Sequence, residues 1–112
     1  MIKKYPLITI IITYYKKKKF IKKTLNSIFQ QSYKNFEVIF VYDDIENEDL
    51  NYVKNLLNKF KKKKLIINKK NLGVAKARNL AIKHSRGSYL AFIDYDDIWK
   101  KNKLKTQLDF MI

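Results

Sequence analysis

The sequence predicts an α/β domain in which a parallel sheet is covered by helices on both faces, in a Rossmann-like arrangement. Segments typical of strands and of helices alternate four times along the 112 residues, and this alternation indicates parallel strands joined by helical crossovers. The main strand-like segments are continuous apolar runs, as expected for strands buried on both faces. Hydrophobic residues make up 46% of the chain, which is enough for one such domain with its own core.

The first half of the chain supplies two strands and two helices. Residues 7–13, LITIIIT, are apolar and rich in β-branched side chains, so we expect a strand buried on both faces. Apolar residues then recur at helical spacing over residues 20–31. A second apolar strand, FEVIFVY, is expected over residues 36–42, and residues 50–60 again show the spacing of an amphipathic helix.

The second half repeats this order. Residues 65–68, LIIN, predict a short third strand, and a helix is expected over residues 74–84. Gly87 follows this helix, and we expect it to act as a left-handed cap at the C-terminal end. Residues 89–93, YLAFI, predict the fourth strand, and the apolar residues within 99–111 indicate a last helix.

Polar side chains gather where three of the predicted strands end. In parallel sheets, ligands bind outside the carboxyl ends of the strands, near a switch in strand order. The polar residues that follow the first, second and fourth strands are Thr13, Tyr14, Tyr15, Asp43, Asp44, Asp94, Asp96 and Asp97. Because three separate segments deliver polar groups to one edge of the sheet, the sequence predicts the binding site at this edge.

Asp94, Asp96 and Asp97 place three carboxylates at one strand end, where their repulsion is costly unless a cation lies between them. Mg²⁺ and Mn²⁺ prefer oxygen ligands and are usually bound by one or two carboxylates together with substrate phosphates. These acids therefore fit a cation site that holds a diphosphate. The alternative is that Asp97 caps the last helix while Asp94 and Asp96 are exposed loop acids. Spacing alone does not decide between the two.

Composition argues against several classes of protein. The chain has no cysteine, and hence no disulfide framework and no thiolate metal site. Two glycines cannot build a G-x-G-x-x-G or Walker A loop, which argues against a dinucleotide dehydrogenase, a P-loop NTPase and a nucleotidyltransferase with a Gly-rich donor loop. No apolar run reaches the length needed to cross a bilayer. His84 lies near a helix end, where we expect a solvated residue rather than a catalytic base.

The charge is strongly basic, with a formal net charge of +15 and lysine runs over residues 16–19 and 61–64. The favoured interpretation is compositional drift, in which the lysines form solvated faces. Attraction to an anionic membrane surface is a second interpretation. Nucleic-acid binding is a third, although it would favour arginine for bidentate contacts.

Three stretches, PLITIIITYY, LNSIFQQSYKNFEVIFVYDD and NLGVAKARNLAIKHSRGSYLAFIDYDDIW, resemble the family 2 glycosyltransferases of the GT-A fold. The resemblance spans nearly all of the chain, and its motifs keep the order and spacing of the family. It implies a nucleotide-sugar site at the predicted carboxyl edge. Thr13 and Tyr15 match residues that contact the uracil or other base. Asp43 matches the second acid of an Asp-Asp pair, which accepts a hydrogen bond from the base.

The resemblance also implies roles for residues of the last quoted stretch. Arg78 matches the basic residue near the nucleotide. Asp94 and Asp96 match the Asp-x-Asp motif, in which Asp94 lies towards the ribose and the metal and Asp96 is the direct ligand of Mn²⁺ or Mg²⁺. Asp97 matches a third acid with a supporting or capping role.

For the whole protein, the resemblance implies an inverting enzyme that transfers a sugar from a nucleoside-diphosphate donor, a UDP-sugar, to a hydroxyl of a glycan or lipid-linked acceptor. It implies cell-surface polysaccharide or glycolipid synthesis, a cytoplasmic location with peripheral contact at the inner membrane face, and no nucleic-acid partner. Residues 1–112 correspond to the donor-binding half of one glycosyltransferase domain. We expect the acceptor-binding half and the catalytic base beyond Ile112, and the fragment alone to be inactive. The alternative is a basic module that binds nucleic acid or anionic membrane without catalysis.

Overall fold

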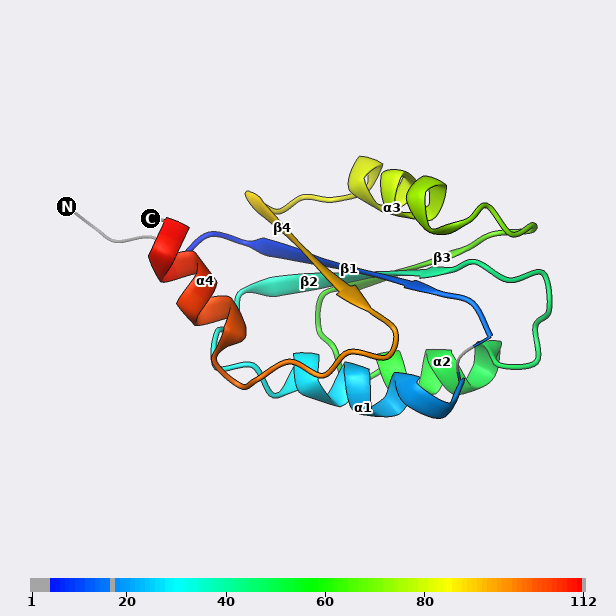
Figure 1. Ribbon diagram of the computed structural model, residues 1–112, viewed down its shortest axis with the longest axis horizontal. Helices are drawn as coiled ribbons and strands as arrows, with labels where there is room; N and C mark the ends of the chain where they lie inside the picture. Colours follow the sequence, from blue (N-terminus) through cyan, green and yellow to red (C-terminus); the bar gives the residue numbers. More distant parts are fainter. Residues whose placement is uncertain (1–4, 17, 112) are drawn as a thin grey trace.

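The computed structural model describes residues 5–16 and 18–111, so Lys17 of the first lysine run and Ile112 lie outside the described residues. Figure 1 shows a sheet with helices on both faces, which confirms the predicted α/β fold. The elements are β1 (Ile8–Tyr14), α1 (Lys18–Phe29), β2 (Phe36–Tyr42), α2 (Leu50–Leu57), β3 (Lys63–Ile67), α3 (Val74–Lys83), β4 (Tyr89–Asp94) and α4 (Lys103–Met111). Within the described segments, no helix combines the length and apolar character that a membrane span requires.

The sheet is parallel throughout, and its strands lie in the order β3-β2-β1-β4. The chain places β2 and β3 on one side of β1 and then returns to place β4 on the other side. Strand order therefore switches between β1 and β4, where Thr13 lies opposite Asp94 in the register. Open α/β sheets bind ligands outside the carboxyl ends of the strands at such a switch.

The two central strands divide the core into two layers, because successive side chains point to opposite faces of the sheet. On one face, Ile10 and Phe40 belong to the larger core cluster with Leu25 of α1, and α2 and α4 add residues to it. On the other face, Ile11 belongs to a smaller cluster with Ala77 of α3. Figure 1 shows α3 on one side of the sheet and α1 and α2 on the other. The small side chain of Ala77 allows α3 to lie close to the sheet.

Several element ends differ from the predicted ones. α2 ends at Leu57, so the buried Phe60 lies in the turn before β3. β3 begins at Lys63, because pairing with β2 rather than apolar character sets the start of this edge strand. α4 begins at Lys103, six residues after Asp97. The interpretation of Asp97 as the cap of the last helix is therefore wrong.

Gly87 is not the left-handed helix cap that the sequence predicts. α3 ends with His84 as its C-cap, and the glycine with positive φ among the described residues is Gly73, at 87°. A Cβ atom at Gly87 would lie 2.6 Å from the backbone N and the Oγ1 of Thr9, and 2.8 Å from the carbonyl oxygen of Leu7. The Gly87 N–H donates to Thr9 Oγ1 at 2.8 Å. A glycine is needed here because the chain enters β4 in direct contact with β1.

Gly87→Ala is expected to lower the free energy of unfolding by about 3 kcal/mol, because the added methyl group overlaps backbone atoms that cannot move without disturbing the sheet. Gly73→Ala is the matched comparison. A Cβ at Gly73 meets nothing within 4 Å, so only backbone strain counts, and at φ 87° and ψ 161° this strain costs about 1–3 kcal/mol. Urea denaturation of the two variants measures both values. Equal midpoints for Gly87→Ala and the unsubstituted chain would contradict the steric explanation.

Candidate functional site

Acidic side chains are concentrated at the carboxyl edge of the sheet. Apart from Glu37 and Asp109, every acidic residue of the chain lies within residues 43–49 or 94–97, at the ends of β2 and β4. Residues 50–93 contain no Asp or Glu. Because parallel strands bring both acidic segments to the same edge, a basic chain presents a local acidic surface there, and such a surface attracts cations.

The acidic cluster formed by Asp94, Asp96 and Asp97 fits a divalent cation. One carboxylate oxygen from each lies within 4.8 Å of the others, and all three residues are exposed. In octahedral coordination, Mg²⁺ holds its ligand oxygens roughly 3 to 4 Å apart, so a small rotation of these side chains would close them around an ion. The donor set contains only oxygen, which suits Mg²⁺ or Mn²⁺ rather than softer metals. A turn closed by the Asp97 N–H and the Asp94 carbonyl, 3.0 Å apart, keeps the three residues together.

Arg78 of α3 forms an ion pair with the acidic cluster. Its Nη2 atom lies 2.9 Å from Oδ1 of Asp94, and its guanidinium carbon lies 5.6 Å from the ring centroid of Phe92. Both partners of the ion pair are substantially exposed, and exposed pairs contribute only about 0–1 kcal/mol to stability. The pair can therefore exchange partners with a bound phosphate or cation at little cost. The structure thus brings together the residues predicted near the nucleotide and near the ribose.

A buried polar stripe along α1 holds the segment that follows the acidic cluster. Thr24 Oγ1 donates to the carbonyl of Tyr95 at 2.7 Å, and Ser27 Oγ accepts the N–H of Trp99 at 3.1 Å. Just after the helix, the buried Gln31 side chain donates to the carbonyl of Lys100 before α4 and accepts the N–H of Leu104 in the first turn of α4. The sequence analysis missed these residues. Their spacing along the buried face of the helix, three and four residues apart, was the signal that could have identified them.

Asp43 is only 3% exposed, and its carboxylate fixes the loop before α3. Its Oδ1 accepts the Asn68 side-chain amide at 2.9 Å and the Leu72 N–H at 2.8 Å. Its Oδ2 accepts the Gly73 N–H at 2.9 Å and the Asn71 side-chain amide at 3.3 Å. An ionised carboxylate offers about four acceptor positions, so Asp43 is satisfied within the chain and positions the start of α3. Its contact with a nucleotide base stays a prediction.

The tyrosines at the end of β1 differ in role. Tyr15 follows β1 at the carboxyl edge and is 44% exposed, whereas Thr13, the second-last residue of β1, is buried at the switch in strand order. Tyr14, although expected at this edge, is buried in the core, and its hydroxyl donates to Asp49 Oδ2 at 2.7 Å. Tyr14 therefore holds the 43–49 segment against the core through its hydrogen bond to Asp49. Base contacts by Thr13 and Tyr15 stay predictions.

Burial raises the pKa of Tyr42 at the end of β2, whose hydroxyl is protonated near neutral pH even without this shift. The hydroxyl donates to the carbonyl of Glu46 at 2.7 Å. Asp44 adds a turn in the same segment, because its Oδ1 accepts the Glu46 N–H at 3.0 Å. Residues 43–49 are therefore held in one conformation by side chains from the core and from the segment itself.

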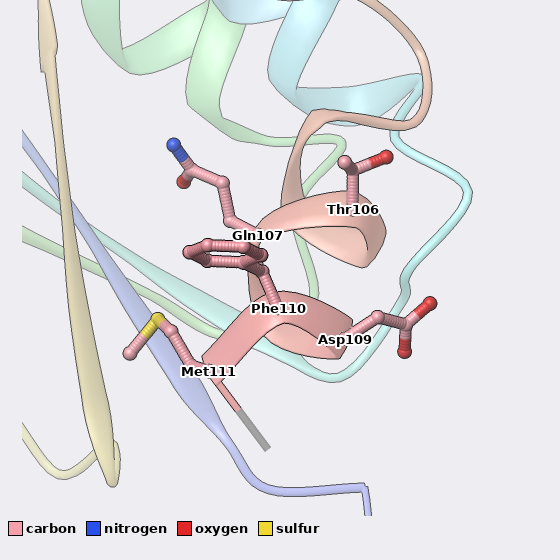
Figure 2. Close-up of a pocket in the computed structure, with 5 residues that line it drawn as sticks. All are labelled: Thr106, Gln107, Asp109, Phe110 and Met111. Atoms are coloured by element: carbon pink, nitrogen blue, oxygen red, sulfur yellow. The ribbon is translucent and has the colours of Figure 1, made fainter.

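A hollow of about 660 Å³ lies along α4, at a distance from the acidic cluster. Figure 2 shows its lining by Thr106, Gln107, Asp109, Phe110 and Met111. Phe110 is 93% exposed, and this surface lacks the convergent polar groups of a nucleotide site. A second hollow, of about 620 Å³, has Asp97 at its rim and runs past Trp99. The acidic cluster therefore remains the candidate functional site.

A parallel α/β sheet with carboxylates at its strand switch is typical of proteins that bind a phosphorylated ligand through a divalent cation. The chain belongs to glycosyl transferase family 2, whose sequence profile matches residues 9–112. The family that the sequence resembles is therefore confirmed.

Two curated relatives show how much of a family member the chain represents. It is 40% identical over 107 residues to WfaP of Escherichia coli, a UDP-Glc:alpha-D-GlcNAc-diphosphoundecaprenol beta-1,3-glucosyltransferase. It is 35% identical over 108 residues to TuaG of Bacillus subtilis (strain 168), a putative teichuronic acid biosynthesis glycosyltransferase. The alignments cover 94% and 96% of this chain but 41% and 42% of the relatives, so the chain spans about two fifths of their length.

Solved structures confirm the GT-A fold. S. aureus TarS 1-349 in complex with UDP-GlcNAc matches with a TM-score of 0.82 and 28% identity, over 93% of this chain and 30% of that one. The mannosyltransferase PcManGT from Pyrobaculum calidifontis, in complex with GDP-Man and Mn²⁺, matches with a TM-score of 0.75 and 25% identity. That match covers 84% of this chain and 28% of the mannosyltransferase.

Proposed function

We propose that this chain is the donor-binding part of a metal-dependent, inverting glycosyltransferase that uses a UDP-sugar. The observation that carries the proposal is the acidic cluster, whose carboxylate oxygens lie within 4.8 Å of one another beside β1, at the switch in strand order. UDP is favoured as the nucleotide because WfaP is named for UDP-Glc and TarS binds UDP-GlcNAc, and both resemble this chain more closely than PcManGT does.

Each residue of the site has a proposed role. Asp96 and Asp94 would hold Mn²⁺ or Mg²⁺, which, when bound, neutralises the diphosphate and stabilises it as a leaving group. Arg78 donates to phosphate or ribose oxygens, and its ion pair with Asp94 keeps it at the edge of the site. Thr13 and Tyr15 contact the base.

Asp43 has a proposed contact with the base as well. All four acceptor positions of its carboxylate are used within the chain, so it would accept an N–H of the base in place of one existing hydrogen bond. The bond from the Asn71 side chain, 3.3 Å long, is the longest of the four and is the one we expect to be exchanged.

In the proposed reaction, an acceptor hydroxyl attacks the anomeric carbon from the side opposite the diphosphate, and the bond from that carbon to the phosphate oxygen breaks. The hydroxyl proton passes to a carboxylate base. We propose that this base and the acceptor site belong to the part of the enzyme that corresponds to the remaining three fifths or so of the relatives. The acceptor is then a glycan or a lipid-linked sugar in cell-surface polysaccharide synthesis, and the donor site faces the cytoplasm.

Isothermal titration calorimetry tests the proposal. UDP is expected to bind the 112-residue chain in the presence of Mn²⁺, and to bind much more weakly when the metal is removed with a chelator. GDP is the control for the base. Binding of UDP that is unaffected by the chelator, or no binding of either nucleotide with Mn²⁺ present, would overturn the proposal. Sugar transfer by this chain alone would overturn the assignment of the base to another part of the enzyme.

A further inference from the structure

A third concave site lies at the amino-terminal edge of the sheet, opposite the acidic cluster. It has a volume of about 360 Å³ and lies where the end of α1, the start of β2 and the turn before β3 meet. Its apolar floor consists of three phenylalanine side chains, Phe29, Phe36 and Phe60. The ring of Phe60 lies 5.7 Å from that of Phe29 and 6.3 Å from that of Phe36, measured between centroids. We call this site the phenylalanine–lysine hollow.

Four lysines form the rim of the hollow, and the acceptors that they contact are uncharged. The lining lysines are Lys34, Lys59, Lys61 and Lys62. Lys34 donates to the carbonyl of Phe29 at 3.2 Å, Lys62 donates to Asn35 Oδ1 at 3.0 Å, and Lys59 donates to Asn26 Oδ1. The salt bridges found among the described residues lie elsewhere, between Arg78 and Asp94 and within α4. The positive charge of the rim is therefore not neutralised by carboxylates in the described part of the chain.

The charged form of Lys59 is destabilised by its position in the hollow. Its Nζ lies 5.1 Å from the ring centroid of Phe29 and 5.9 Å from that of Phe60. Burial lowers the pKa of Lys59, and the neighbouring charge of Lys22 lowers it further. An anion that reached the rim would relieve both effects, because it would return an opposite charge to a partly desolvated ammonium group.

The chain has few acidic residues that could place a negative charge at the rim of the hollow. Residues 1–36 and 50–93 contain no Asp or Glu. Glu37 follows Phe36 directly, but its carboxylate accepts the Thr9 hydroxyl at 2.6 Å and the Arg86 N–H at 2.7 Å. Thr9 is a β1 residue one step before Ile10, so this network lies on the face of the sheet that α3 covers.

We propose that the phenylalanine–lysine hollow docks on the surface of an anionic lipid bilayer, with its lysines at the headgroup phosphates and Phe29 in the interface. Charge complementarity favours this partner, since lysines near an anionic surface are attracted to it individually. Phe29 is 44% exposed, so part of its ring is available for insertion. The inference goes beyond the proposed function and does not depend on it.

The same residues are less suited to nucleic acid. Bases stack on open aromatic faces, but Lys34 and Lys59 lie over the ring of Phe29, at 5.9 Å and 5.1 Å from its centroid. Phe60 is buried and meets Phe29 edge-on at 83°. The rim contains no arginine for bidentate phosphate contacts.

Vesicle co-sedimentation of the chain tests this inference, with equimolar phosphatidylglycerol and phosphatidylcholine compared with pure phosphatidylcholine. The chain is expected to bind the anionic vesicles only. The variant with Lys34→Gln, Lys61→Gln and Lys62→Gln is expected to bind them roughly a hundredfold more weakly, about a factor of five for each lysine. All three lysines are exposed, so the variant should keep its fold, and circular dichroism checks this.

Two further variants separate docking through this hollow from general attraction of a basic chain. Lys69→Gln, Lys76→Gln and Lys83→Gln together remove the same charge at exposed positions in α3 and the loop before it, and should weaken vesicle binding by less than about threefold. Phe29→Ser should weaken vesicle binding about fivefold but leave the binding of a mixed-sequence oligonucleotide unchanged. Equal losses in the two lysine variants, or unchanged vesicle binding by Phe29→Ser, would overturn the proposal. So would an oligonucleotide that binds more tightly than the vesicles and responds to Phe29→Ser.

Discussion

Asp96→Asn is expected to weaken the Mn²⁺-dependent binding of UDP by roughly a hundredfold, a loss at the upper end of what changes around a metal site produce. The substitution keeps the size of the side chain but removes one negative charge from the acidic cluster, whose carboxylate oxygens lie within 4.8 Å of one another. A neutral amide oxygen is a much weaker partner for a hard divalent cation than a carboxylate. Calorimetric titration of UDP at a fixed Mn²⁺ concentration measures the effect.

The control for this experiment is Asp109→Asn on α4. Asp109 is an exposed acid that pairs with Lys105 at 2.9 Å, so its substitution makes the same change in net charge away from the carboxyl edge. We expect this variant to bind UDP and Mn²⁺ like the unsubstituted chain. If both variants lost the same affinity for UDP, Asp96 and Asp109 would act only through the net charge of the protein. The assignment of Asp96 as a metal ligand would then be wrong.

Asp43→Asn is expected to lower the free energy of unfolding by about 3 to 4 kcal/mol. The carboxylate accepts hydrogen bonds from the Leu72 and Gly73 N–H groups and from two asparagine amides. An amide group in its place would point two N–H bonds at groups that are themselves donors, and a buried donor without an acceptor is costly. The urea midpoint measures the loss of stability.

Asp44→Asn provides the matched comparison for this prediction. Asp44 is also buried, but one of its oxygens accepts the N–H of Glu46, and an asparagine oxygen can accept the same bond. We expect a loss below about 1 kcal/mol. Similar midpoints for the Asp43 and Asp44 variants would show that buried negative charge itself, and not the hydrogen bonds to the loop before α3, determines the stability.

Most of the fold could be predicted from local pattern. The apolar runs of β1 and β2 identified the central strands, because strands buried on both faces are nearly continuous runs of apolar residues. The one charged residue in them, Glu37, lies next to the start of β2 and is hydrogen-bonded to Thr9 and Arg86. The ends of the elements were less predictable. Lys63 and Lys64 belong to β3 because an edge strand is stabilised by its pairing with β2 while its side chains remain in solvent. The expected α2 continued to Phe60, which is instead buried from a turn.

The acidic edge of the sheet could be predicted from the order of the elements, because parallel strands bring residues 43–49 and 94–97 to the same edge. The structure places Asp94 beside Arg78 and opposite Thr13 in the register. The buried polar stripe of α1 was not predicted. Serine and threonine in a helix are usually interpreted as surface residues, and their partners in the 95–104 segment lie about 70 residues away.

The sequence by itself determined the succession of strands and helices, the parallel sheet, and the edge at which the acids collect. Only the tertiary structure decided that Gly87 is a contact residue against Thr9, 78 residues earlier, rather than a helix cap. It also decided that Asp43 is surrounded by donors from the loop before α3. The reason is that periodicity reports which way a side chain points relative to its neighbours in sequence. Which distant atoms it meets depends on how the completed elements pack.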